Sequence, residues 1–91
     1  MNTNIKNNKM GLGLKDNKNT YMIKYDTQAK SPLRIQKTDI TGNKEIFEFY
    51  TIKDTALFLK NDGFDGYNDC NDKQCPQMLV NTFNNSGQVI S

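Results

Sequence analysis

The fold of this chain is decided by residues 33–60, whose sequence is LRIQKTDITGNKEIFEFYTIKDTALFLK. In its first part apolar and polar residues alternate with a period of two, which predicts strands at residues 33–41 and 45–50. Gly42 and Asn43 lie between these strands and accept the positive φ angles of a tight hairpin turn. The second strand has apolar residues on both faces, so we expect it to lie inside the sheet, covered on both sides.

A helix is predicted directly after the hairpin, over residues 52–60. Thr51 and Asp54 form a T-x-x-D box, in which the Thr51 hydroxyl accepts a hydrogen bond from the backbone N–H of Asp54. Gly63 follows the helix and suits the left-handed conformation that ends many helices. The apolar residues that recur along one face of the helix are Ile52, Ala56 and Leu59.

Three further elements are predicted on either side of this stretch. Residues 20–25, TYMIKY, are rich in β-branched and aromatic residues and alternate, which is typical of a strand. A second helix is expected over residues 74–83, with Asn71 or Asp72 as its cap. Residues 89–90 are expected to form either a short strand or a docking tail.

The composition of residues 1–19 differs from that of the other segments. Ten of these residues are Asn or Lys, and Gly11 and Gly13 interrupt the few apolar ones. Such a segment cannot bury enough apolar surface to offset its ordering entropy, so we expect a basic N-terminal arm. The prediction is therefore a single small α+β domain at residues 20–91, with a small antiparallel sheet of about three strands and two helices packed on one face.

The electric charge of the chain is divided between its two halves. The net charge of the 91 residues is +2, but residues 1–44 carry nine Lys or Arg and three Asp, whereas residues 45–91 carry three Lys and seven Asp or Glu. The halves therefore have net charges of +6 and −4. A basic half is suited to nucleic acid or to an acidic protein surface. The alternative, at even weight, is a solvated surface whose two signs happen to segregate.

The chain lacks the side chains of most catalytic and metal sites. It contains no histidine, which excludes the usual serine and cysteine triads and imidazole metal ligands. Cys70 and Cys75 are two ligands where structural zinc takes four. The Asn/Asp-rich loop at residues 61–72 resembles a calcium loop in part, but an ordinary connector is favoured because Gly63 stands at a ligand position. We expect a protein that is not an enzyme and has no cofactor or metal.

The sequence contains no run of roughly 18 apolar residues, the length that spans a membrane. No apolar region follows the first lysines, so a signal peptide is not expected. We therefore expect an intracellular protein, in the cytoplasm of a bacterial host or in a phage particle, without membrane contact. In that setting Cys70 and Cys75 are expected to be reduced.

Basic and aromatic side chains gather on and around the predicted hairpin. Lysine and arginine contact phosphate, and Tyr21, Tyr25 and Tyr50 interleave with them in the sequence. Lysines also protect sheet edges, so ordinary strand solubility is the alternative. The candidate residues for contact with nucleic acid or a protein partner are Lys30, Arg34, Lys37, Lys44, Tyr50 and Lys53.

Part of the chain resembles the NUMOD-type modular DNA-binding repeats of phage and intron homing endonucleases. The similarity covers residues 31–60 and rests on a hairpin TDITGN (38–43), a strand end EIFEF (45–49) and a helix opening TIKDTA (51–56) before Leu59. It implies a hairpin followed by a helix-turn-helix that contacts DNA. The nuclease domain of those enzymes is absent from these residues. The segment after Leu59 is also longer than a helix-turn-helix turn, and the second predicted helix has no basic residue.

Two functions follow from these observations. The first is a small non-catalytic protein of phage or mobile-element origin that contacts nucleic acid through its basic N-terminal half. The second is a small phage-type protein that binds a larger host or viral protein and either inhibits it or assembles with it. Binding to nucleic acid weakens steeply with salt, which separates the two hypotheses experimentally.

Overall fold

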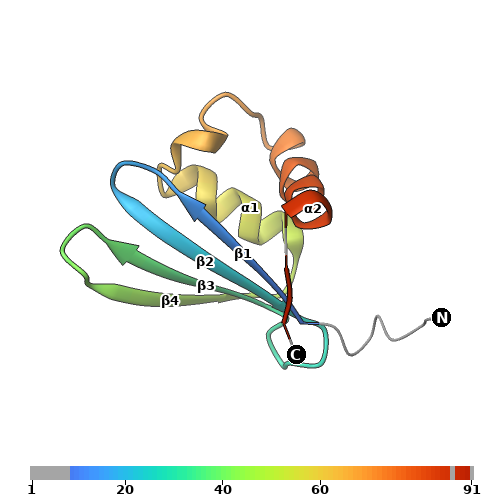
Figure 1. Cartoon of the computed structure of the whole chain (residues 1–91). Coiled ribbons are helices and arrows are strands. Elements are labelled where there is room, and N and C mark those ends of the chain that lie inside the picture. Colours follow the sequence, from blue (N-terminus) through green and yellow to red (C-terminus); the bar gives the residue numbers. More distant parts are fainter. Residues whose placement is uncertain (1–8, 87, 91) are drawn as a thin grey trace.

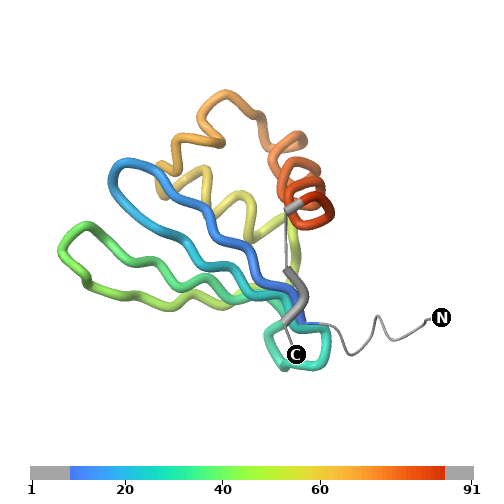
Figure 2. The backbone as a smooth tube through the Cα atoms, viewed as in Figure 1, coloured from blue at the N-terminus to red at the C-terminus, as the bar shows by residue number. Residues whose placement is uncertain are grey.

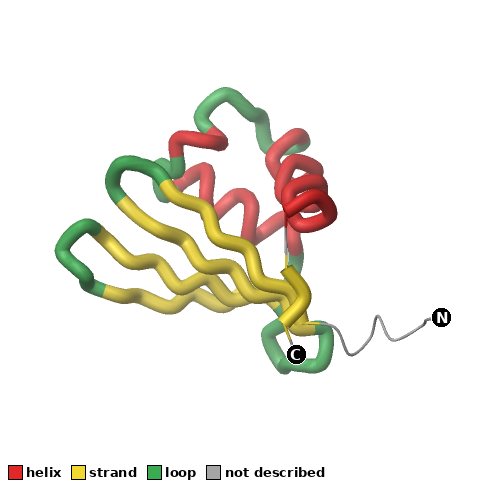
Figure 3. Tube along the Cα trace, in the orientation of Figure 1, coloured by secondary structure: helices red, strands yellow, loops and turns green. Residues whose placement is uncertain are grey.

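The chain folds into one antiparallel sheet with both helices on one of its faces (Figures 1 and 3). The computed structural model describes residues 9–86 and 88–90. The predicted α+β class is confirmed, with a five-stranded sheet in place of about three strands. The elements are β1 (Lys9–Lys15), β2 (Asn19–Asp26), β3 (Leu33–Asp39), β4 (Lys44–Phe49), α1 (Ile52–Asn61), the short 3₁₀ helix η2 (Asp65–Tyr67), α2 (Gln74–Ser86) and β5 (Gln88–Ile90).

Strands β1 to β4 form a meander in which each strand pairs with the next. After β4 the chain passes through α1, η2 and α2 and returns as β5 on the outer side of β1. The strand order is therefore β4-β3-β2-β1-β5, and every neighbouring pair is antiparallel. Figure 2 shows the β1–β2 turn and the β3–β4 turn projecting at the same end of the sheet.

The apolar core lies between the sheet and the two helices. Leu12, Ile23 and Ile35 form one cross-strand row of it, because Ile23 pairs with both of the others. Leu59 from α1 and Leu79 from α2 belong to the same buried cluster. Full burial of an aliphatic side chain contributes about 1.5 to 3 kcal/mol, so this row strongly favours one face of each strand as the covered face.

The predicted N-terminal arm is wrong for residues 9–15, which form β1 inside the sheet. The alternating apolar residues of β1 face the helices, and Gly11 and Gly13 face away, opposite Lys24 and Met22. The glycines obscured the strand pattern in the sequence. Pairing with β2 and β5 supplies the backbone hydrogen bonds that such a strand needs in order to be stable. Residues 1–8 of the predicted arm lie outside the described residues.

The prediction that the second hairpin strand is central and covered on both sides is also wrong. Within the described residues, β4 is an edge strand that pairs only with β3. Phe47 and Phe49 lie against Phe58 of α1, with ring centroids 4.5 and 5.3 Å from that of Phe58. Ile46 on the opposite face is 59% exposed. Strand β4 therefore has one face that α1 covers, with Phe47 and Phe49, and one exposed face, with Ile46.

Helix α1 begins and ends where its local sequence predicts. The hydroxyl of Thr51 accepts a hydrogen bond of 3.0 Å from the N–H of Asp54. At the other end Gly63 has a φ of 93°, and its N–H donates to the carbonyl of Lys60. Gly42 in the β3–β4 turn has a φ of 92°. The predicted cap, helix end and hairpin turn are confirmed.

The second helix and the last strand also follow the sequence pattern. Asn71 caps α2, because its side-chain oxygen accepts hydrogen bonds from the N–H groups of Lys73 and Gln74. α2 continues beyond the predicted end at residue 83, and β5 realises the strand alternative for residues 89–90. Leu79 and Phe83 of α2 are buried, as their helical spacing indicates.

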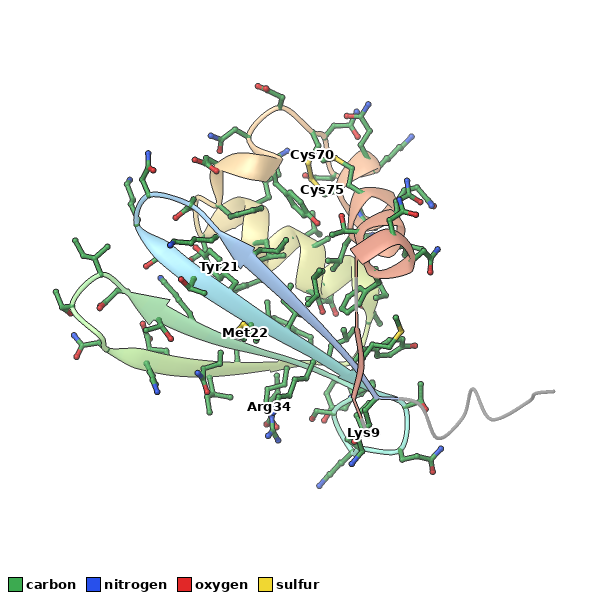
Figure 4. The ribbon with its side chains drawn as sticks, viewed as in Figure 1. Lys9, Tyr21, Met22, Arg34, Cys70 and Cys75 are labelled. Carbon is green, nitrogen blue, oxygen red and sulfur yellow. A yellow bond between two sulfur atoms is a disulfide. The ribbon has the colours of Figure 1, made fainter. Side chains whose placement is uncertain are left out.

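Cys70 and Cys75 form a disulfide, contrary to the prediction of two reduced thiols. The cap at Asn71 turns the chain back between them, so their Cα atoms lie 5.7 Å apart, within the range that a disulfide spans. Both cysteines are buried, and Figure 4 shows them where the loop after η2 meets α2. Disulfides persist mainly in oxidising surroundings, so a reducing cytoplasm is not the setting that this bond favours.

Reduction of the disulfide should destabilise the fold. A bridge closing the loop 70–75 is expected to contribute about 2 kcal/mol by restricting the unfolded chain. Urea unfolding of the native chain should therefore shift to lower urea when a reductant is added. The matched variant Cys70→Ala/Cys75→Ala should not respond to the reductant. Labelling of two thiols in the native, unreduced protein would contradict the bridge.

Candidate nucleic-acid interface

We call the side of the sheet that the helices leave uncovered the open face. In Figure 4 Arg34 and Lys9 lie on this side, whereas Tyr21 lies on the side of the helices. An antiparallel sheet commonly has one face in the core and the other in solvent. The strand register assigns to the open face Lys9, Gly11, Gly13, Lys15, Thr20, Met22, Lys24, Asp26, Arg34, Gln36, Thr38, Lys44, Ile46 and Glu48.

The open face has a positive net charge. Its five cations outnumber its two anions, which leaves a net charge of +3. A carboxylate oxygen of Asp26 lies 3.9 Å from Nζ of Lys9, and one of Glu48 lies 3.1 Å from the guanidinium of Arg34. The lysines of this face that form no salt bridge within the described chain are Lys15, Lys24 and Lys44. These side chains are available for a phosphate group.

The helical layer on the other side of the sheet is acidic. Residues 50–86 carry three lysines and five aspartates, a net charge of −2. The division of charge along the sequence therefore becomes a division between two sides of the molecule. An anionic polymer is attracted to the open face and repelled by the helical layer, which favours one orientation of binding.

The open face is shallow and lacks rings. A hollow of about 240 Å³ lies between β2, β3 and β4 and is lined by Met22, Lys24, Arg34, Gln36 and Ile46. Among the described residues, none of those assigned to this face is aromatic. Proteins that bind single strands stack the bases on aromatic rings. The open face is therefore suited to contacts with phosphate and not to the stacking of bases.

The structure divides the six residues predicted from sequence among five places, of which Lys37 occupies one and the other five residues occupy four. Arg34 and Lys44 lie on the open face. Lys30 lies in the β2–β3 loop and Lys53 in the first turn of α1, both exposed. Tyr50, directly after β4, is 66% exposed. These residues lie on different elements, and only Arg34 and Lys44 of them belong to the open face by the strand register, so the open face and not the predicted set defines the candidate interface.

Lys37, the sixth predicted residue, lies on the covered face and is occupied by an internal contact. Its Nζ is 2.9 Å from a carboxylate oxygen of Asp62, just after α1, and the two side chains are only 19% and 21% exposed. The hydroxyl of Tyr21 donates a hydrogen bond of 2.8 Å to the same carboxylate. Burial and this hydrogen bond raise the pKa of Tyr21. Lys37 therefore joins β3 to the end of α1 and is not available for a partner.

Loss of the Asp62 contacts should destabilise the chain. Tyr21→Phe removes a hydrogen bond to a carboxylate, which is expected to lower the free energy of unfolding by about 2 kcal/mol. Asp62→Asn should lower the free energy of unfolding by a similar amount, because it leaves the half-buried Lys37 ammonium without its counter-charge. Urea unfolding measures both. The exposed Asp69→Asn serves as the control, and a loss for Asp69→Asn as large as for Asp62→Asn would contradict the assignment.

Tyr67 should make the fold sensitive to alkaline pH. Its hydroxyl is buried without a hydrogen-bond partner within the described residues, and burial raises the pKa of Tyr67 from 10.0 to about 12. Below pH 10 both states keep the proton. Between pH 10 and about 12 the Tyr67 hydroxyl has lost its proton in the unfolded state but still holds it in the folded state. Tyr67 therefore lowers the free energy of unfolding by at most about 1.4 kcal/mol for each pH unit in this range.

The matched variant Tyr67→Phe should lose part of this pH dependence. It should also raise the free energy of unfolding at pH 7 by up to about 1 kcal/mol, because it removes an unsatisfied buried hydroxyl. Urea unfolding at pH 7 and pH 11 tests both statements. A clear destabilisation at pH 7 would mean that the hydroxyl has a partner after all.

Sequence reasoning did not select three open-face lysines, Lys9, Lys15 and Lys24. Lys9 and Lys15 lie in β1, whose residues the composition predicts to be part of an N-terminal arm. The alternation of Met10, Leu12 and Leu14 was the available signal, since it places the intervening lysines and glycines together on the opposite face. Lys24 can be assigned to the open face only when it is known which side of β2 the helices cover.

No protein-family model, curated protein or solved structure matches the chain. Within residues 9–86 and 88–90, no helix is long and apolar enough to cross a membrane. The described residues also bring together no group of three Cys, Asp or Glu side chains that could hold a metal ion. Support for a function therefore comes from the charge and shape of the open face.

Proposed function

We propose that this chain is a small non-catalytic protein that binds nucleic acid by contacting the phosphate backbone with its open face. The observation that carries the proposal is the net charge of +3 on an uncovered sheet face, with an acidic helical layer behind it. Lysine and arginine side chains supply most of the affinity of such contacts by releasing counterions from the phosphates.

The proposed contact is not specific for sequence. The open face has no aromatic ring among its described residues for stacking, and it is a broad surface without an element that enters a groove. Arg34 is further restrained by Glu48, so base reading by its guanidinium competes with a salt bridge. Contacts to phosphate position a protein without reading bases.

The resemblance of residues 31–60 to NUMOD-type repeats supports the same class of partner and a phage or mobile-element origin. In those residues β3, β4 and α1 follow one another as a hairpin and a helix. Residues 62–73, which include η2, separate α1 from α2, so the two helices are not joined by a short helix-turn-helix turn. The proposal therefore uses the sheet and not α2 as the contact surface.

A larger protein as the partner, either inhibited by the chain or assembled with it, is the second candidate. It is favoured by a hollow of about 360 Å³ between η2 and α2, on the acidic side of the molecule. Met78 in its wall is 37% exposed, and methionine is common on adaptable protein-binding surfaces. The residues of the wall are Gly66, Asp69, Cys70, Gln74, Gln77, Met78 and Asn81.

Salt dependence separates the two candidates. If about four phosphates are contacted, affinity for a random duplex should fall roughly 100-fold between 50 and 200 mM salt. Fluorescence anisotropy with a labelled duplex measures this change. Absence of binding at low salt would contradict the proposed function and leave the protein partner as the candidate.

A pair of matched variants locates the contact. Lys15→Gln/Lys24→Gln removes two cations from the open face and should reduce the slope of log affinity against log salt by about 1.8. Lys53→Gln/Lys73→Gln removes the same charge from the helical side and should leave the slope unchanged. Equal effects of the two variants would show attraction by net charge alone and would exclude the open face as the interface.

A further inference from the structure

The outer edge of β4 is regular, and within the described residues charged side chains are its only protection. Its register with β3 is continuous from Lys44 to Phe49, without a bulge, and the strand contains no proline. In the part of the chain that the structure describes, β4 has a strand neighbour on one side only. Natural edge strands are commonly shortened, bulged or interrupted by proline, because an open edge pairs readily with another strand.

Exposed apolar side chains concentrate at this edge. Ile46 lies in the middle of β4 and is 59% exposed. Ile40 in the turn before β4 is 82% exposed, and Tyr50 directly after it is 66% exposed. Three of the five large hydrophobic residues that are exposed in the described chain therefore lie on or next to one short strand. Covering these side chains by a partner would remove apolar surface from water, which favours association.

We propose that β4 is a self-association edge, at which two copies of the chain pair their β4 strands antiparallel about a twofold axis through Ile46. In this register Ile46 lies opposite Ile46 of the second copy. Lys44 lies opposite Glu48 of the second copy, and Glu48 opposite its Lys44. Directly opposed residues of antiparallel strands share a face, so all these contacts form on the open face.

Charge selects this register among the alternatives. An axis between Ile46 and Phe47 is excluded by the pleat, because it would oppose residues of different faces, such as Glu45 and Glu48. Shifting the axis to Glu45 would place two glutamates opposite each other. Like charges in directly opposed positions are destabilising. Shifting the axis to Phe47 would lose both lysine–glutamate pairs. Arg34 uses Oε2 of Glu48, which leaves Oε1 for the second cation.

The ends of β4 fit the same arrangement. Tyr50 comes opposite Gly42 of the second copy, in the turn between β3 and β4. A side chain built on Gly42 would meet nothing within 4 Å, so the space over this glycine is open. An aromatic ring can lie over it from the neighbouring copy. The pairing joins two sheets into one continuous sheet, with both helical layers on the same side and both open faces on the other.

Mixing of charge variants tests the register. Edge pairs of this size belong to the weak class of interfaces, so a dissociation constant between about 1 μM and 1 mM is expected by sedimentation velocity. Lys44→Glu alone and Glu48→Lys alone should each weaken self-association about 30-fold, because two attractive cross-strand pairs become repulsive. An equimolar mixture of the two variants should recover a dimer, since glutamates of one copy then oppose lysines of the other.

Lys24→Glu is the control for net charge, because Lys24 lies on β2 away from the edge. It should dimerise like the native chain. Failure of the mixture to dimerise, or an equal loss for Lys24→Glu, would overturn the register.

Crosslinking tests the twofold axis without any change of charge. Ile46→Cys should form a dimer linked through residue 46 under oxidised glutathione, because opposed Cα atoms lie about 5 Å apart and the native cysteines are already paired. Lys24→Cys is the control, since the two copies of this residue would lie more than about 24 Å apart, the width of five strand spacings. A monomeric native chain at millimolar concentration together with no crosslink through Ile46→Cys would overturn the proposal and leave the edge to a strand of another protein.

Discussion

The buried row of Leu12, Ile23 and Ile35 is the constraint on which the other features depend. A slip of one residue in any of these strands would turn its apolar side chains towards solvent, so the row holds the register of β1, β2 and β3. Because side chains alternate, the same register places the lysines of β1 and β2 on the opposite face. The basic open face is thus a direct consequence of the way the core is packed.

Local signals predicted the elements well, and long-range placement poorly. The turn at Gly42, the cap at Thr51 and the helix end at Gly63 each depend on neighbouring residues, and each is found as expected. The edge position of β4 depends on which strands join the sheet, and the pairing of β1 with β5 joins segments far apart in the sequence, so no local pattern encodes either. The pairing of β1 with β2 is local, but Gly11 and Gly13 obscured the alternation that predicts it. The disulfide required the return of the chain at Asn71, which cysteine spacing does not show.

The candidate site shows the same difference between what local sequence predicts and what the packing of distant segments decides. A list of cations near the hairpin included Lys37, whose ammonium is held by Asp62 inside the molecule, and omitted Lys15, which lies on the open face. Alternation alone places Lys37 with the apolar residues of β3, but only the structure supplies its counter-charge. Charge counted along a chain therefore shows that a basic surface exists. The register of the strands shows which lysines belong to it.

The pairing of β5 with β1 also sets an order of events during synthesis. Residues 9–11 are made long before residues 88–90, with which they pair, and all of the helical layer separates the two. Contacts between such distant segments carry the largest loop-closure cost and form late. Until β5 leaves the ribosome, this end of β1 has a free outer edge. The nascent meander thus has two open edges, and the arrival of β5 covers residues 9–11 of one of them, while within the described residues β4 keeps its free edge.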